Sequence, residues 1–131
     1  MIFVDAGAWY ANAIKDDDNS AAARQWFDSH STRLITSDYV VDETLTLLKS
    51  RRHMAAALRL GEMFFAGKLA DIVMVTEVDI IEAWETFRGY RDKDWSFTDC
   101  TSKVLMARLG ITTAFSFDAH FRQFGTVTVV P

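Results

Sequence analysis

The chain has 131 residues, of which 50% are apolar and 13% aromatic, enough apolar material for a packed core and unlike a disordered chain. Its 18 acidic residues outnumber its 14 lysines and arginines, and the formal net charge of −4 argues against broad, non-specific attraction to nucleic acid. The single cysteine, the acid at position five and the lack of the roughly 20 apolar residues that span a bilayer predict a cytoplasmic protein.

Short apolar or β-branched runs alternate with helical patterns along the whole chain. Buried strands are predicted at residues 2–4, 34–36, 72–76, 113–117 and 127–130. Helices are predicted at residues 20–29, 39–48, 54–65, 78–90 and 98–109. This alternation is typical of an α/β/α sandwich with a mostly parallel central sheet and more helix than strand. No repeat, linker or internal proline divides the chain, so we expect a single domain over residues 1–131.

Two acids follow predicted strands directly. Asp5 comes after the first strand, and Asp118 comes after the strand that is predicted to end at Phe117. In open α/β sheets, ligands bind outside the carboxyl ends of the strands, so both acids are candidates for a functional site. Each also has an ordinary interpretation, since an aspartate between a strand and a helix is a common N-cap.

Two further acids lie on predicted helices. Asp99 is the third residue after Ser96, a spacing that indicates a capping box and is also compatible with a site at the helix start. Glu43 shares its helix face with the apolar residues Val40 and Leu47, and no lysine or arginine lies at a helical spacing that would pair with it. Because a buried, unpaired charge is costly, Glu43 needs a partner from elsewhere in the protein or a metal.

The four acids are most informative as a set. If Asp5, Glu43, Asp99 and Asp118 converge on one rim of the sheet, their mutual repulsion raises their pKa values unless divalent cations neutralise them. An all-oxygen ligand set suits Mg²⁺ or Mn²⁺ better than zinc. We therefore predict that these four carboxylates form a metal site.

Four short motifs carry a resemblance to a known family. They are IFVD at residues 2–5, SDYVVDETLTLL at 37–48, SFTDC at 96–100 and FDAHF at 117–121. In this order and spacing they resemble the PIN-domain family and, within it, the VapC toxins of type II toxin–antitoxin pairs. The resemblance runs the length of the chain, and no acidic position departs from the family pattern.

The resemblance implies an endoribonuclease that hydrolyses RNA phosphodiester bonds with metal-activated water and leaves a 5′-phosphate and a 3′-hydroxyl. Asp5, Asp99 and Asp118 then correspond to metal-binding acids, and Glu43 to an acid that binds a second metal or orients the water. Thr98 and Ser116 correspond to supporting polar neighbours of the site. The implied partners are RNA, a cognate antitoxin and a second copy of the chain in a homodimer, whereas the RNA target and the number of metals stay open.

Other functions remain open at this point. A PIN-like module could bind RNA or protein without cutting, and a Mg²⁺-dependent phospho-Asp phosphotransfer domain also uses clustered acids, with Lys103 as the available lysine. A Ser-His-Asp hydrolase has little support because the chain lacks a Gly-x-Ser-x-Gly elbow. A transition-metal site is disfavoured because no pair of His or Cys residues has ligand spacing, which leaves His120 a minor role in substrate contact.

Overall fold

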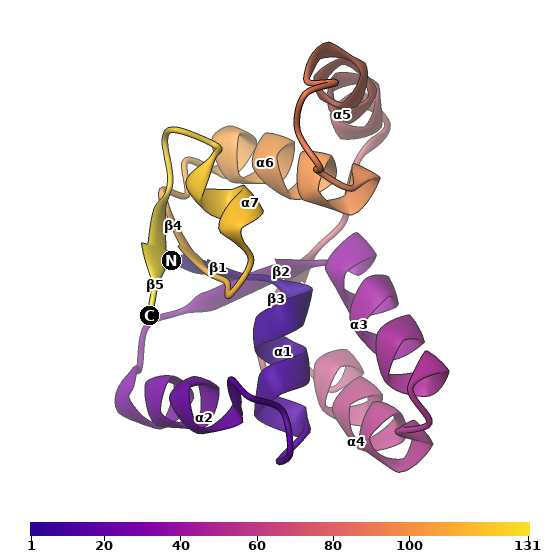
Figure 1. The fold of residues 1–131 in the computed structure, drawn as a ribbon, viewed down its shortest axis with the longest axis vertical. Helices are drawn as coiled ribbons and strands as arrows, with labels where there is room; N and C mark the ends of the chain where they lie inside the picture. The colour runs from indigo at the N-terminus through magenta and orange to yellow at the C-terminus, as the bar shows by residue number, and fades with distance from the viewer.

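A computed structural model describes residues 1–131 and contains one five-stranded sheet (Figure 1). Its strands are β1 (Ile2–Val4), β2 (Leu34–Ser37), β3 (Asp71–Val73), β4 (Thr113–Phe115) and β5 (Thr128–Val130). They lie in the order β3-β2-β1-β4-β5, and every neighbouring pair is parallel. The predicted α/β class with a parallel central sheet is confirmed.

Helices cover both faces of the sheet and account for more residues than the strands, as predicted. They are α1 (Ala6–Ala13), α2 (Ser20–Ser29), α3 (Asp38–Ser50), α4 (Met54–Phe65), α5 (Glu77–Gly89), α6 (Phe97–Leu109) and α7 (Ala119–Arg122). In Figure 1, α1 and α2 lie on one side of the sheet, and α6 and α7 lie on the other. None of these helices has the length and apolar character needed to cross a membrane.

Two strands end earlier than predicted, because polar residues at the ends of these runs serve the next helix instead. The predicted strand at 72–76 ends at Val73, and Thr76 accepts a hydrogen bond from the Asp79 backbone N–H as the N-cap of α5. The predicted strand at 113–117 ends at Phe115, and Ser116 begins the turn that leads into α7. The polar ends of these apolar runs are therefore helix-capping segments.

The sheet order places the carboxyl ends of β1 and β4 at the centre of the fold. From β1 the chain moves to β2 on one side, and it later returns to β4 on the other, so the switch in direction lies between β1 and β4. Ligands of open α/β sheets bind outside the strands at such a point. The register pairs Val4 with Phe115, which brings the next residues, Asp5 and Ser116, side by side.

The core is one cluster of 29 buried side chains around the sheet. Trp9, Trp26 and Trp95 belong to it, in agreement with the prediction that the tryptophans are mostly core residues. The Trp9 indole N–H donates a hydrogen bond to the Thr36 hydroxyl at 3.3 Å, which satisfies its polar atom inside the core. Trp84 differs, since it is 51% exposed on α5.

Candidate active site

All four predicted acids line one hollow of about 300 Å³ at the carboxyl ends of β1 and β4. Each comes from a different segment: Asp5 from the end of β1, Glu43 from α3, Asp99 from α6 and Asp118 from the turn after β4. The other lining residues are Ala6, Gly7, Leu47, Ser96 and His120. No lysine or arginine lines this hollow, and His120 is the basic side chain that reaches the acids there.

Asp5 occupies the N-cap position of α1, but its carboxylate does not cap the helix. Instead, the Ser116 hydroxyl donates a hydrogen bond to Asp5 Oδ2 at 3.0 Å, and the side chain faces the hollow. Burial, followed by the charges of Asp99 and Glu43, raises the pKa of Asp5 from 3.8 to about 7, against the opposing effects of the Ala6 backbone and the Ser116 hydroxyl. The capping interpretation of Asp5 is therefore wrong.

Asp118 and Ser116 are linked at the end of β4. The Asp118 backbone N–H donates to the Ser116 hydroxyl at 3.0 Å, and the Asp118 carboxylate accepts from the His120 backbone N–H at 2.9 Å. Asp118 thus caps α7 and also lines the hollow. Ser116 is 2% exposed and joins Asp5 to Asp118, and its predicted role as a supporting neighbour of the site stays a prediction.

Asp99 also combines a capping role with a position in the hollow. Its carboxylate accepts from the Ser96 backbone N–H at 3.0 Å, and its own backbone N–H donates to the Ser96 hydroxyl at 3.0 Å. The predicted neighbour Thr98 does not line the hollow, and Ser96 does so in its place. Successive residues on a helix are about 100° apart, so the side chain next to Asp99 points elsewhere.

Glu43 lies half-buried on α3, while the adjacent Asp42 is exposed, in agreement with the helical pattern. Burial raises the pKa of Glu43, and the charges of Asp99, Asp118 and Asp42 raise it further. The expected rise in carboxyl pKa is thus confirmed for Asp5 and Glu43. Burial and then the neighbouring charges destabilise both ionised carboxylates, so the cluster is arranged to gain from a bound cation.

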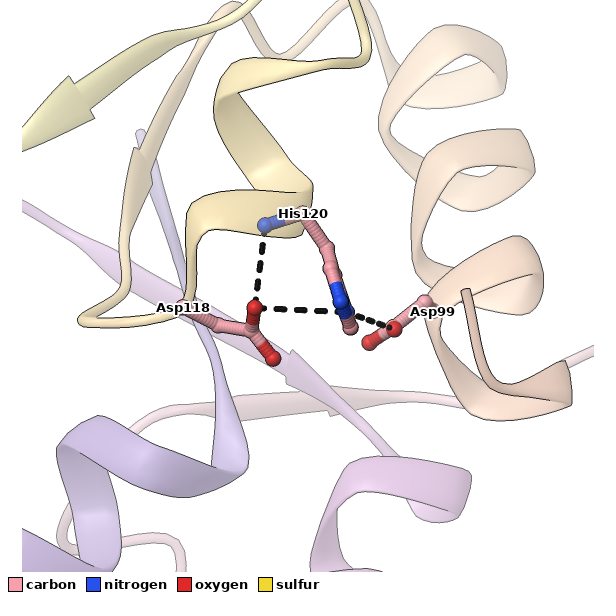
Figure 2. A group of neighbouring side chains, drawn as sticks. All are labelled: Asp99, Asp118 and His120. Carbon is pink, nitrogen blue, oxygen red and sulfur yellow. Dashed lines mark hydrogen bonds and ion pairs between the residues drawn. The ribbon is translucent and has the colours of Figure 1, made fainter. Parts of the chain in front are cut away.

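His120 is the residue at this site whose importance was missed at the sequence level. Figure 2 shows its ring between two of the acids, with Nδ1 lying 2.9 Å from Asp99 Oδ2 and 3.2 Å from Asp118 Oδ1. Burial alone lowers the pKa of His120, but the hydrogen bond to Asp99 and the charges of Asp118 and Asp99 outweigh it and raise the pKa. The available signal was its position two residues after Asp118, at the start of a helix.

Lysines and arginines do not line the hollow that holds the acids. Lys103, the lysine that a phosphotransfer domain would need, lines a different hollow with Gly110 and Val127. Arg52 and His53, from one of the basic stretches, line another hollow with Arg59. Clustered oxygen donors with a histidine but no lysine or arginine beside them fit a divalent cation and do not fit phospho-Asp chemistry that relies on a lysine.

Comparisons with known proteins agree with this arrangement. A family model described as the PIN domain matches residues 2–127. The 23S rRNA-specific endonuclease VapC20 of Mycobacterium tuberculosis is 34% identical over 134 residues, which cover 100% of this chain and 99% of the relative.

Two solved structures have the same fold. The crystal structure of Mycobacterium tuberculosis VapC20, described as a sarcin-ricin loop cleaving toxin, superposes with a TM-score of 0.92 at 30% identity and 100% coverage of both chains. FitAcB from Neisseria gonorrhoeae superposes with a TM-score of 0.73 at 16% identity, covering 100% of this chain and 97% of the other. At that lower identity the likeness shows the fold alone.

Proposed function

The chain belongs to the PIN-domain family, and from this premise we propose that it is a metal-dependent endoribonuclease, the toxin of a type II toxin–antitoxin pair. The observation that carries the proposal is the convergence of Asp5, Glu43, Asp99 and Asp118 on one hollow that no lysine or arginine lines. A non-catalytic binding module has no need for a carboxylate cluster in which burial and neighbouring charges raise the pKa values of Asp5 and Glu43, because such carboxylates cost stability when ionised.

Asp5, Asp99 and Asp118 are the residues that would hold a divalent cation, Mg²⁺ or Mn²⁺. Such an ion, when bound, polarises the phosphoryl group and lowers the pKa of water. Ser116 fixes the Asp5 carboxylate by its hydroxyl, and Ser96 fixes the Asp99 carboxylate by its backbone N–H. Glu43, half-buried at the rim, is suited to orient the attacking water and accept its proton.

The proposed reaction is hydrolysis of one RNA phosphodiester bond. The water oxygen forms a bond to phosphorus, the bond from phosphorus to the 3′-oxygen breaks, and a proton ends on that 3′-oxygen. The products are a 5′-phosphate and a 3′-hydroxyl. Similarity over the full chain to a 23S rRNA-specific endonuclease makes ribosomal RNA the substrate that we propose, with the sarcin-ricin loop as its target.

The direct test is incubation of the purified protein, free of any antitoxin, with intact ribosomes and with total RNA in Mg²⁺ or Mn²⁺. Primer extension along 23S rRNA should show a discrete cut that EDTA and Glu43→Gln both abolish. Asp42→Asn is the matched control, because this acid is adjacent on α3 but exposed, and it should leave cleavage intact. Folded wild-type protein that binds RNA and never cuts it would favour the binding module.

We further propose that the chain acts as a single domain in the cytoplasm, with an antitoxin and a second copy of itself as protein partners. Two exposed apolar faces support this. One is on α5 and includes Val78, Ile81 and Trp84, and the other is on α4 and includes Leu58 and Phe65, which is 75% exposed. Exposed apolar faces commonly mark protein interfaces. Light scattering should report a dimer, and Ile81→Lys should shift it to monomer if α5 is the dimer face.

A further inference from the structure

His120 is held against the acids by its own backbone. Its N–H donates to Asp118 Oδ1 at 2.9 Å, which fixes the start of α7 relative to that carboxylate. The side chain is 26% exposed, between Asp118 at 41% and Asp99 at 8%. The imidazole therefore forms part of the wall of the hollow, and its Nδ1 edge faces the carboxylates (Figure 2).

The spacing of the three donor atoms matches that of ligands on one ion. In an octahedral shell with bonds of about 2.1 Å, neighbouring ligand atoms are about 3.0 Å apart. His120 Nδ1 lies 2.9 Å from Asp99 Oδ2 and 3.2 Å from Asp118 Oδ1. One donor atom from each of the three residues falls within 4.8 Å of the others. These side chains are thus already close enough to share one cation.

The other ring nitrogen, Nε2, is free to keep the proton while Nδ1 binds the cation. A ligating histidine is neutral, so Nδ1 must be free of its proton while Nε2 keeps one. In the structure, Nδ1 is the nitrogen that faces the acids, and Nε2 has no hydrogen-bond partner in the protein. Because the side chain is partly exposed, Nε2–H can donate to water, as the second nitrogen of a metal-bound histidine commonly does.

We propose that Nδ1 of His120 is a ligand of the same divalent cation as Asp99 and Asp118, and that this nitrogen makes the site select Mn²⁺ over Mg²⁺. Mg²⁺ is a hard ion that takes oxygen ligands, whereas first-row transition ions such as Mn²⁺ accept imidazole nitrogen together with carboxylate oxygen. The inference rests on the proposed metal-dependent function, and it identifies which metal that function uses.

The test measures metal binding rather than cleavage. Calorimetric titration with MnCl₂ and with MgCl₂, and pulsed EPR of the Mn²⁺-loaded protein, are applied to the wild type, His120→Gln and His53→Gln. His53 is the matched control, since it lines a separate hollow. The wild type should show the nitrogen coupling of a directly bound imidazole and should bind Mn²⁺ more tightly than Mg²⁺. His120→Gln should lose the coupling and bind Mn²⁺ at least about 10-fold more weakly, with little change for Mg²⁺.

Two results would overturn the inference, and they are distinguishable. If the wild type binds Mn²⁺ without nitrogen coupling, or if His120→Gln weakens both ions equally, His120 only hydrogen-bonds to the acids and the proposed nuclease still stands. If the wild type binds neither ion, this inference fails together with the proposed metal-dependent function. The EPR signal comes from the wild type, so the test does not depend on how well the variant folds.

Discussion

The first turns of α5 and α6 contain the same capping motif, but the charged side chains around the two motifs differ. In both, an aspartate three residues after a hydroxyl N-cap completes a capping box: Asp79 after Thr76, and Asp99 after Ser96. Both aspartates are almost fully buried, at 1% and 5% exposure. The side chains that reach them from elsewhere differ, so two identical local structures acquire different roles.

Asp79 is neutralised by the protein itself. Arg108, in the last turn of α6, donates two hydrogen bonds of 2.9 Å to its two carboxylate oxygens. Burial alone raises the pKa of Asp79, but the Arg108 and Thr76 hydrogen bonds outweigh it and lower the pKa. Asp99 shares a hollow with Asp5, Glu43 and Asp118, and no arginine or lysine lines it. Asp79 is thus paired with an arginine and has a structural role, whereas Asp99, which has only the His120 imidazole beside it, is available for a ligand.

The largest expected effect is on activity. Asp99→Asn should reduce RNA cleavage by about 10³-fold, because a proposed metal ligand is lost and metal binding supplies several kcal/mol of transition-state stabilisation. The protein should stay folded, since the asparagine oxygen can still accept from the Ser96 N–H. Cleavage rates per folded molecule, with Asp79→Asn as the control, measure the contrast. Comparable losses in both variants would contradict it.

Asp5 in the hollow and Asp79 beside Arg108 predict opposite pH dependences of stability. In EDTA, the free energy of unfolding should fall as pH rises from about 4 to about 7, because the folded-state pKa of Asp5 is about 7 against an ordinary value of 3.8. This effect of Asp5 is on the order of 4 kcal/mol. The raised pKa values of Glu43 and His120 act in the same direction.

At the acidic end of the pH range, Asp79 should make the free energy of unfolding fall as the pH falls. Its lowered pKa contributes stability above about pH 4, and that stability is lost as the pH falls further. Denaturant titrations from pH 3 to pH 8 measure both arms. Asp5→Asn should flatten the fall toward pH 7, and Mn²⁺ should reverse it. A profile in EDTA that rises steadily to pH 8 would show that burial and the neighbouring acids do not raise the pKa of Asp5.

The location of the site was predictable because it depends on short-range rules. Strand alternation predicts a parallel sheet, Asp5 and Asp118 follow strands, and the helical period turns Glu43 inward while Asp42 stays exposed. Parallel strands bring their carboxyl ends to one rim, so the convergence of the acids follows from the topology.

The remaining features depend on packing between distant segments. The pairing of Asp79 with Arg108 requires α5 to lie against α6, and no sequence spacing encodes that contact. His120 faces the acids because the Asp118 cap orients a helix of only four residues, which is too short to produce a periodic pattern. Thr98 was expected at the site from the family resemblance, but the helical rotation between it and Asp99 turns its side chain out of the hollow.

The next expected effect is on stability. Asp79→Asn should lower the free energy of unfolding by about 2 kcal/mol, because hydrogen bonds to a charged group are lost and Arg108 keeps an unpaired charge. Adding Arg108→Met to Asp79→Asn should recover part of that loss, since no unpaired charge then remains. Urea denaturation of the two single variants and the double variant measures this coupling. Strictly additive losses would show that the pair does not interact.

The smallest expected effects come from the two N-caps, which are the most closely matched pair in the molecule. Thr76→Ala and Ser96→Ala each remove the side-chain oxygen that accepts the N3 backbone N–H, and each should cost about 1 kcal/mol of stability. Only Ser96→Ala should also affect the site, because it loosens the turn that holds the Asp99 carboxylate. We expect its Mn²⁺ affinity to fall by about 10-fold while Thr76→Ala binds as the wild type does. Equal Mn²⁺ affinities in the two variants would mean that the Asp99 carboxylate is positioned by its neighbours in the hollow and not by its cap.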